Sequence, residues 1–298
     1  MAWRDGAQED SVLPSKQRLI ELHIQHHVEE FYNHTDGPRF NIVKNFYYEQ
    51  HTRQTYDYAV SRMKHYEAMD KLILDPWDAL ELGGTFNDDS DPDNELDQIH
   101  HSFQVAEALR KAFPDEEKYG WLHLTGLIHD LGKILTPAFG EPQWSNTGDT
   151  FPVGCKFERV GVFPRFFDEN PDSKHPIYST QLGIYQPGCG LNNLTMCFSH
   201  DEYMYKVLKH EKNATQITEK QLPIQAYYMI RFHSFFPWHT FEAYTIFEDE
   251  MDKQNKEWVQ MFAKFDLYSK SHDVVDIEKV KPYYEKLIKQ YLPAKLYF

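Results

Sequence analysis

The sequence has few cysteines: Cys155, Cys189 and Cys197 are the only three among 298 residues. An odd number this small cannot build a disulfide framework or a thiolate metal cage, and it suits a reducing cytosol. Basic residues are also scarce, because 31 Lys and Arg stand against 46 Asp and Glu and leave a formal net charge of −15. A chain this acidic lacks the positive field that nucleic acids and anionic membrane surfaces attract. We therefore expect neither of them as a partner.

Long apolar runs are missing as well. No stretch of the chain approaches the roughly 18 residues of a membrane-spanning helix, and residues 1–6 lack the apolar region of a signal peptide. Hydrophobic residues make up 41% of the chain and charged residues 26%, which is the balance of a globular protein. We expect a monomeric, cytoplasmic protein.

Apolar residues recur at helical spacing through most of the chain, and no alternating strand, repeat or linker stands out. The predicted helical segments are 19–27, 41–69, 76–83, 98–113, 115–131, 194–210, 218–235, 252–269 and 276–291. Between residues 136 and 190 the sequence is dense in Gly and Pro, which predicts a long ordered loop region of the kind that is often functional. The predicted fold class is all-α, with a partly flexible N-terminal segment (1–30) and a single helical domain (31–298).

Several metal-competent side chains fall on the apolar faces of these helices. Four of them lie on four separate predicted helices: His101, His200, His233 and Asp266. A fifth segment, 122–133, has one apolar face and a second face that bears His129, Asp130 and Lys133. This pattern predicts a central helix that is buried on both sides.

A single His on an apolar face is more often a structural residue than a ligand, but a carboxylate is different. An ionised carboxylate that is buried without a partner costs several kcal/mol or more, so Asp266 needs either Lys/Arg or a metal ion beside it. Four His and two Asp are too many for one catalytic metal with an open position, and they match two metals that share a carboxylate. Imidazole and carboxylate together favour Fe, Mn or Zn over Mg or Ca.

The pattern of His101, His129-Asp130 and a distant Asp266 resembles the H…HD…D pattern of the HD-domain superfamily of helical metalloenzymes. Longer motifs make the resemblance specific: HDLGK at 129–133, FGEPQW at 139–144, GDTFPVGC at 148–155, HDEYMY at 200–205, IRFHSF at 230–235 and KFDLY at 264–268. Together they resemble the myo-inositol oxygenase family, and the resemblance runs from about residue 31 to the C-terminus.

The resemblance implies an HD-domain-like helical core and an enzyme that cleaves the ring of myo-inositol with O2 to give D-glucuronate, the first step of inositol catabolism. It implies two iron ions per chain, with a mixed-valent Fe(II)/Fe(III) pair as the active form. One iron is expected to take His101, His129, Asp130 and Asp266. The other is expected to take His200 and His233, with Asp130 as the bridge.

The resemblance also implies a set of substrate contacts: Asp88, Ser90, Lys133, Gly148, Asp149, His233 and Ser234. Lys133 is expected to be catalytic, because its ammonium would orient a substrate hydroxyl and ease its deprotonation. Its alternative role is a salt bridge to Asp130 or another acid, and Asp88 and Ser90 are alternatively plain turn residues. One departure is visible, since Tyr32 stands where the family usually has Arg, and it would replace that contact only as a neutral hydrogen-bonding group.

Two other functions compete with this one. An HD-domain metal-dependent phosphohydrolase would use His101, His129, Asp130 and Asp266 but leaves His200 and His233 less well explained, and the acidic stretch around Asp88 does not suit phosphate. A helical scaffold with a structural metal or buried ion pairs would not need the elaborate loop at 139–155.

Overall fold

The computed structural model describes residues 39–90, 97–268 and 275–298. The predicted N-terminal segment 1–30, the predicted helix at 19–27 and Tyr32 lie outside these ranges. The α-helices are, in chain order, α3 (Phe40–Arg53), α4 (Tyr56–Tyr66), α5 (Pro76–Gly83), α6 (Gln98–Ala112), α7 (Glu116–Ile128), α8 (Leu135–Phe139), α9 (Gln143–Asn146), α10 (His200–Lys209), α11 (Glu211–Ala214), α12 (Ile224–Phe232), α13 (Phe236–His239), α14 (Glu250–Tyr268) and α15 (Ile277–Tyr291). Short 3₁₀ helices lie between them: η2 (Leu131–Ile134), η3 (Pro164–Glu169), η4 (Pro171–Lys174), η5 (Leu191–Asn193) and η6 (Thr245–Phe247).

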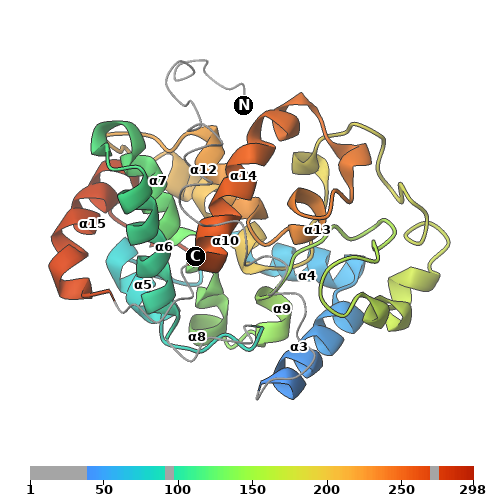
Figure 1. Cartoon of the computed structure of the whole chain (residues 1–298). Helices are drawn as coiled ribbons and strands as arrows, with labels where there is room; N and C mark the ends of the chain where they lie inside the picture. The colour runs from blue at the N-terminus through green and yellow to red at the C-terminus, as the bar shows by residue number, and fades with distance from the viewer. Residues whose placement is uncertain (1–38, 91–96, 269–274) are drawn as a thin grey trace.

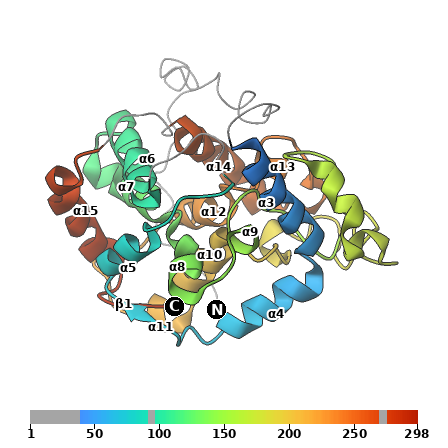
Figure 2. The same ribbon diagram turned by 90° about the horizontal axis from the view of Figure 1, so that it is seen from below.

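The fold is all-α, as the sequence predicts (Figure 1). The described residues contain one small sheet, in which β1 (Ile73–Leu74) pairs antiparallel with β2 (Leu296–Tyr297) and ties the end of the chain to the segment before α5. Helices α3 and α4 lie on the side of the molecule opposite α15 (Figure 2). Within the described residues, no helix combines the length and apolarity needed to cross a membrane.

Helix α7 and the turn that follows it form the centre of the core. Helix α7 packs against α6, α12 and α15, and every residue from Gly120 to Leu135 is buried, which confirms the predicted two-sided burial of this segment. Gly126 permits the close approach of α6, because a Cβ at this position would lie 2.8 Å from a methyl of Leu109. Gly132 likewise allows the turn after α7 to contact the start of α10.

Local sequence chemistry explains where several helices begin. Asp75 caps α5 by accepting a hydrogen bond from the backbone N–H of Trp77, with Pro76 at the first helical position. Asp115 caps α7 by accepting from the N–H of Lys118. The region 136–190 is largely irregular, with only short helical turns, and it packs along one side of the helical core (Figure 1).

Four predicted helices have different bounds in the structure. Of the predicted segment 194–210, only His200–Lys209 is helical, as α10. The predicted segment 41–69 divides into α3 and α4 at Gln54. The side chain of Gln54 is fully buried, and it donates to the carbonyls of Ser145 and Phe198 and accepts from the N–H of Phe198. These long-range bonds hold Gln54 in a non-helical conformation that no local signal predicts.

The predicted helix 218–235 begins later in the structure, because α12 starts at Ile224. Pro223 precedes α12, and the residue before a proline is disfavoured in the α conformation. Helix α7 ends at Ile128 rather than continuing to Lys133, and the chain tightens into η2. Asp130 and Lys133 are both buried at this change of helix type.

Candidate metal centre and substrate pocket

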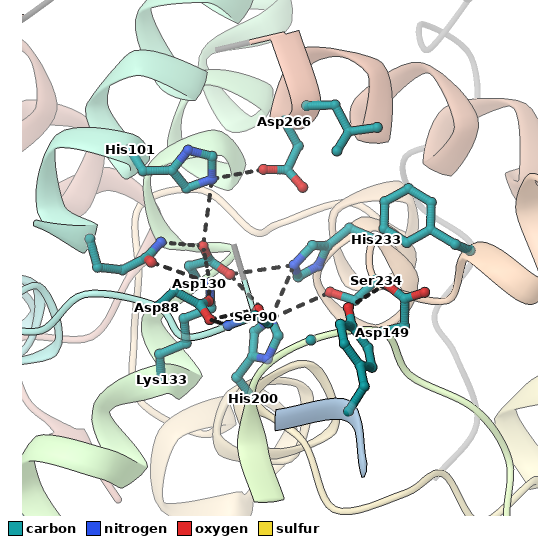
Figure 3. A pocket seen from close by; sticks show the side chains of 15 residues that line it. Asp88, Ser90, His101, Asp130, Lys133, Asp149, His200, His233, Ser234 and Asp266 are labelled. Atoms are coloured by element: carbon teal, nitrogen blue, oxygen red, sulfur yellow. Dashed lines mark hydrogen bonds and ion pairs between the residues drawn. The ribbon is translucent and has the colours of Figure 1, made fainter. Parts of the chain in front are cut away.

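The four predicted histidines come together from four different elements, and Figure 3 shows His101, His200 and His233 around Asp130. His101 lies in the second turn of α6, His129 follows α7 directly, His200 opens α10 and His233 follows α12. All four are buried. Helix α10 begins at His200 because the Ser199 hydroxyl caps it by accepting from the N–H of Glu202.

Backbone carbonyls set the orientation of three of the imidazole rings. Nδ1 lies 2.8 Å from the Gly126 carbonyl in His129 and 2.6 Å from the Asn146 carbonyl in His200. In His233 it lies 3.1 Å from the Met229 carbonyl. A carbonyl oxygen only accepts, so Nδ1 carries a proton in each ring, and Nε2 is the nitrogen that points into the cluster.

The carboxylate of Asp130 lies between two pairs of histidines. Its Oδ1 is 3.2 Å from Nε2 of His200 and 3.5 Å from Nε2 of His233. Its Oδ2 is 3.3 Å from Nε2 of His129 and 3.7 Å from Nε2 of His101. Each oxygen therefore faces one pair, which is the arrangement that a bridging carboxylate requires.

Asp266, on α14, faces the pair formed by His101 and His129. Its Oδ1 lies 2.8 Å from Nε2 of His101 and 3.5 Å from Nε2 of His129. On the other side, Asp201 contacts His200, with its Oδ1 2.7 Å from Nε2. Asp201 is not among the site residues predicted from the sequence. Its position next to His200 at the start of a helix with a buried face was the available signal.

The buried carboxylates control the protonation of the histidines. Burial by itself lowers the pKa of a histidine, but Asp130 and Asp266 outweigh burial and raise the pKa of His129 to about 10. Asp201 and Asp130 do the same for His200, whose pKa is raised to about 9. Burial raises the pKa of a carboxyl, yet His129 and Lys133 hold the pKa of Asp130 well below its usual range. The carboxylates therefore favour a positive charge at both rings, which a proton supplies in the metal-free protein and a metal ion would supply in its place.

The donor set fits metal ions. Three groups of buried side chains each place their ligand atoms within 4.8 Å of one another: His101 with His129 and Asp266, His129 with Asp130 and His233, and His200 with Asp201 and His233. Nε2 of His129 is buried and makes no hydrogen bond to any described residue, as expected of an atom reserved for a metal. Imidazole and carboxylate ligands suit Fe, Mn or Zn.

A pocket opens beside the cluster. Most of the residues that sequence analysis proposed line it: Asp88, Ser90, His101, Asp130, Lys133, Gly148, Asp149, His200, His233, Ser234 and Asp266. His129 lies behind this lining, within the cluster. Tyr32 is outside the described residues, and its role stays a prediction.

Lys133 reaches into the pocket floor from η2. Its ammonium lies 2.8 Å from Oδ2 of Asp88 and 2.9 Å from Oδ2 of Asp130. These two carboxylates raise its pKa against the effect of burial. The ion pair with Asp130, which was the alternative role for Lys133, is thus present in this structure.

The acidic turn at Asp88 presents a preorganised carboxylate. The hydroxyl of Ser90 donates to Oδ1 of Asp88 at 2.6 Å and its N–H donates to the same oxygen at 2.8 Å. Burial raises the pKa of Asp88, but the neighbouring Lys133 and these bonds lower it to about 2. Asp88 and Ser90 are therefore turn residues and pocket residues at once.

The opposite wall combines further hydroxyl and carboxylate groups. The Tyr47 hydroxyl lies 3.4 Å from Oδ1 of Asp149, and the Ser234 hydroxyl donates to Oδ1 of Asp201 at 3.1 Å. Gly148 has a φ of 76°, and a Cβ there would lie 2.6 Å from the ring of Phe46. Only glycine therefore fits this close turn beneath the pocket.

Two further polar residues line the pocket that the sequence had not indicated, Gln98 and Tyr47. Gln98 lies three residues before His101 on the same face of α6, so helical periodicity was enough to find it. Tyr47 lies on α3, and only the packing of α3 against the loop of Asp149 brings it to the pocket. Together, the lining offers many directional donors and acceptors next to a metal-binding cluster.

Known proteins are similar to this chain over most of its length. A family model described as myo-inositol oxygenase matches residues 40–298. The inositol oxygenase of Dictyostelium discoideum is 47% identical over 278 residues, which are 92% of this chain and 92% of that protein. Inositol oxygenase 4 of Arabidopsis thaliana is 49% identical over 263 residues (88% of this chain, 80% of that protein). The inositol oxygenase of Homo sapiens is 45% identical over 267 residues (89% and 90%).

Proposed function

The chain belongs to the myo-inositol oxygenase family, and from this premise we propose that it cleaves the ring of myo-inositol with O2 to give D-glucuronate at a site that holds two iron ions. Family membership makes the chain an oxygenase. The number and identity of the metals, the product and the roles of the individual residues are the parts that we propose.

One metal would take His101, His129, Asp130 and Asp266, which is also the H…HD…D set of the HD-domain superfamily. The other would take His200 and His233 and share Asp130. The observation that carries this assignment is the placement of Asp130, whose two oxygens each face one histidine pair at 3.2–3.7 Å. A structural ion pair needs only one of these contacts.

When bound, a mixed-valent iron pair supplies O2 binding and electron transfer. The balance is myo-inositol plus O2 to glucuronate plus water, a four-electron oxidation in which O2 accepts all four electrons, so no external reductant is consumed. Oxygen-rich side chains suit a neutral polyol: Asp88 and Asp149 accept hydrogen bonds from its hydroxyls, while Ser90 and Ser234 both donate and accept.

Lys133 would donate a hydrogen bond to the substrate hydroxyl that loses its proton. An ammonium next to that oxygen favours the alkoxide as it develops. Lys133 is the only Lys or Arg in the described lining of the pocket, which does not suit a phosphate substrate. The phosphohydrolase alternative is therefore not favoured.

The test is anaerobic loading with Fe(II), followed by O2 and myo-inositol and analysis of the product. We expect two irons per chain, D-glucuronate as the product and a half-integer-spin EPR signal from the half-oxidised pair. One metal per chain, or full activity on a phosphate ester with Mg²⁺ alone, would contradict the proposal.

A further inference from the structure

Lys133 has no hydrogen-bonding capacity left for a substrate in this structure. An ammonium has three N–H donors, and the Lys133 ammonium has three acceptors around it. Oδ2 of Asp88 lies at 2.8 Å, Oδ2 of Asp130 at 2.9 Å and Oε1 of Gln98 at 3.3 Å. One of these contacts must open before Lys133 can donate to a substrate hydroxyl.

Oδ2 of Asp130 carries two donors at once. Nε2 of Gln98 donates to it at 2.5 Å, and Lys133 donates to it at 2.9 Å. A carboxylate oxygen has about two lone pairs. If one of them binds a metal ion, only one of the two donors can stay.

Gln98 is the donor that stays. Its amide is neutral and has the shorter bond, and its backbone is anchored at the start of α6, where its N–H donates to the carbonyl of Phe86. A metal ion repels the ammonium of Lys133. That ammonium also forms an ion pair with Asp88, which would keep it near the pocket. The chemistry of the partners fixes the amide orientation, because a carboxylate cannot donate and an ammonium cannot accept.

We propose that Gln98 is a positioning residue that holds the bridging carboxylate of Asp130 and thereby releases Lys133 to the substrate. This inference rests on the proposed function. An amide is suited to the task because it donates to the carboxylate and accepts from the ammonium at the same time, which neither a carboxylate nor an apolar side chain can do.

The test is Gln98→Met, which keeps an unbranched side chain of similar length and removes both hydrogen bonds. Without the amide, Lys133 stays hydrogen-bonded to Asp130 and does not become free to donate to the substrate. We expect two irons per chain to be retained, kcat to fall by about tenfold, the lower end of the cost of changes around a metal ligand, and anaerobic inositol binding measured by calorimetry to weaken severalfold.

A double-mutant cycle separates this role from a purely structural one. In a Lys133→Ala background, Gln98→Met should have no further effect on kcat, because the residue through which it acts is gone. Gln104→Met is the matched control, since Gln104 is also buried on α6 but does not line the pocket. It should retain wild-type kcat and inositol affinity.

Several outcomes would overturn the inference: unchanged kcat in Gln98→Met, additive losses in the cycle, or loss of iron from Gln98→Met, which would assign the amide to metal retention instead. Failure of the proposed function looks different, because the wild type and Gln104→Met would then also lack inositol cleavage after iron loading.

Discussion

The protein buries two kinds of histidine, and their surroundings give them opposite properties. His129 and His200 face carboxylates, which raise their pKa values to about 10 and about 9. His51 and His239 are also buried, but they face a backbone carbonyl each. Burial dominates there and lowers the pKa of His51 to about 3 and that of His239 to about 4.

This difference shows that burial does not identify a ligand. His51 stacks on Phe167 with ring centroids 3.9 Å apart and stays neutral as a structural residue. His129 lies among carboxylates that would repel one another without a cation. Neighbouring carboxylates therefore distinguish a metal centre from a core that happens to contain histidine. Substitutions of charged groups inside and outside the cluster should show this difference most clearly.

The largest effect is expected from Asp130→Asn. The amide cannot bridge two metals as a carboxylate does, so iron content should fall below two per chain. Turnover should fall by at least about 10²-fold, the upper end of the cost of changes around metal ligands. The matched control is Asp252→Asn, because Asp252 is fully buried but binds the Tyr228 hydroxyl and the N–H of Leu191 outside the cluster. Iron analysis and turnover on both variants decide the assignment; normal iron in Asp130→Asn would show that it is not the bridge.

Lys133→Ala should keep both irons but lower kcat by about 10²–10³-fold, the cost of one preorganised donor. Lys133→Arg should not restore turnover, because a planar guanidinium group cannot replace a compact ammonium in a crowded site. The control is Lys256→Ala, since Lys256 also contacts two carboxylates, Glu242 at 2.6 Å and Glu248 at 3.0 Å, away from the pocket. Near-normal kcat in Lys133→Ala would leave Lys133 with only its ion-pair role.

The metal-free protein should lose stability as the pH rises. His129 and His200 bind protons more tightly in the folded state than in the unfolded state, where the pKa is 6.5. Their contribution is therefore full below pH 6.5 and is lost as the pH rises toward about 9 and about 10, by an amount on the order of a few kcal/mol. Denaturant unfolding between pH 6 and 10 measures it. The iron-loaded protein should lack this loss, because metal ligation deprotonates both rings.

The smallest effect is expected at acidic pH, where the free energy of unfolding should depend on His51, a single residue outside the cluster. His51 protonates at a pH of about 6.5 when unfolded but only at about 3 when folded, so the unfolded state gains protons as the pH falls between these values. Stability is full above pH 6.5 and declines below it. His51→Gln should flatten this decline by removing the titration. An unchanged slope of unfolding free energy against pH from 6.5 to 4 would show that His51 does not contribute.

Helical periodicity was sufficient to nominate the metal-competent side chains, whereas the substrate contacts came from the family resemblance. His101, His200, His233 and Asp266 each interrupt an apolar stripe, and a stripe is a local property that depends on residues three and four apart. The caps at Asp75 and Asp115 were predictable for the same reason. The all-α fold class and the buried segment around His129 followed from the same periodicity.

The sequence by itself determined which helices form and which side chains face inward, because these depend on neighbours within a turn or two. Only the tertiary structure decided which oxygen of Asp130 faces which histidine pair, that Lys133 pairs with Asp88, that Gln98 meets Asp130 and that Gln54 breaks a helix. Those contacts join residues far apart in the chain, 165 positions for His101 and Asp266. Side-chain partners at such separations are chosen by the packing of whole helices against one another, and no local propensity encodes that packing.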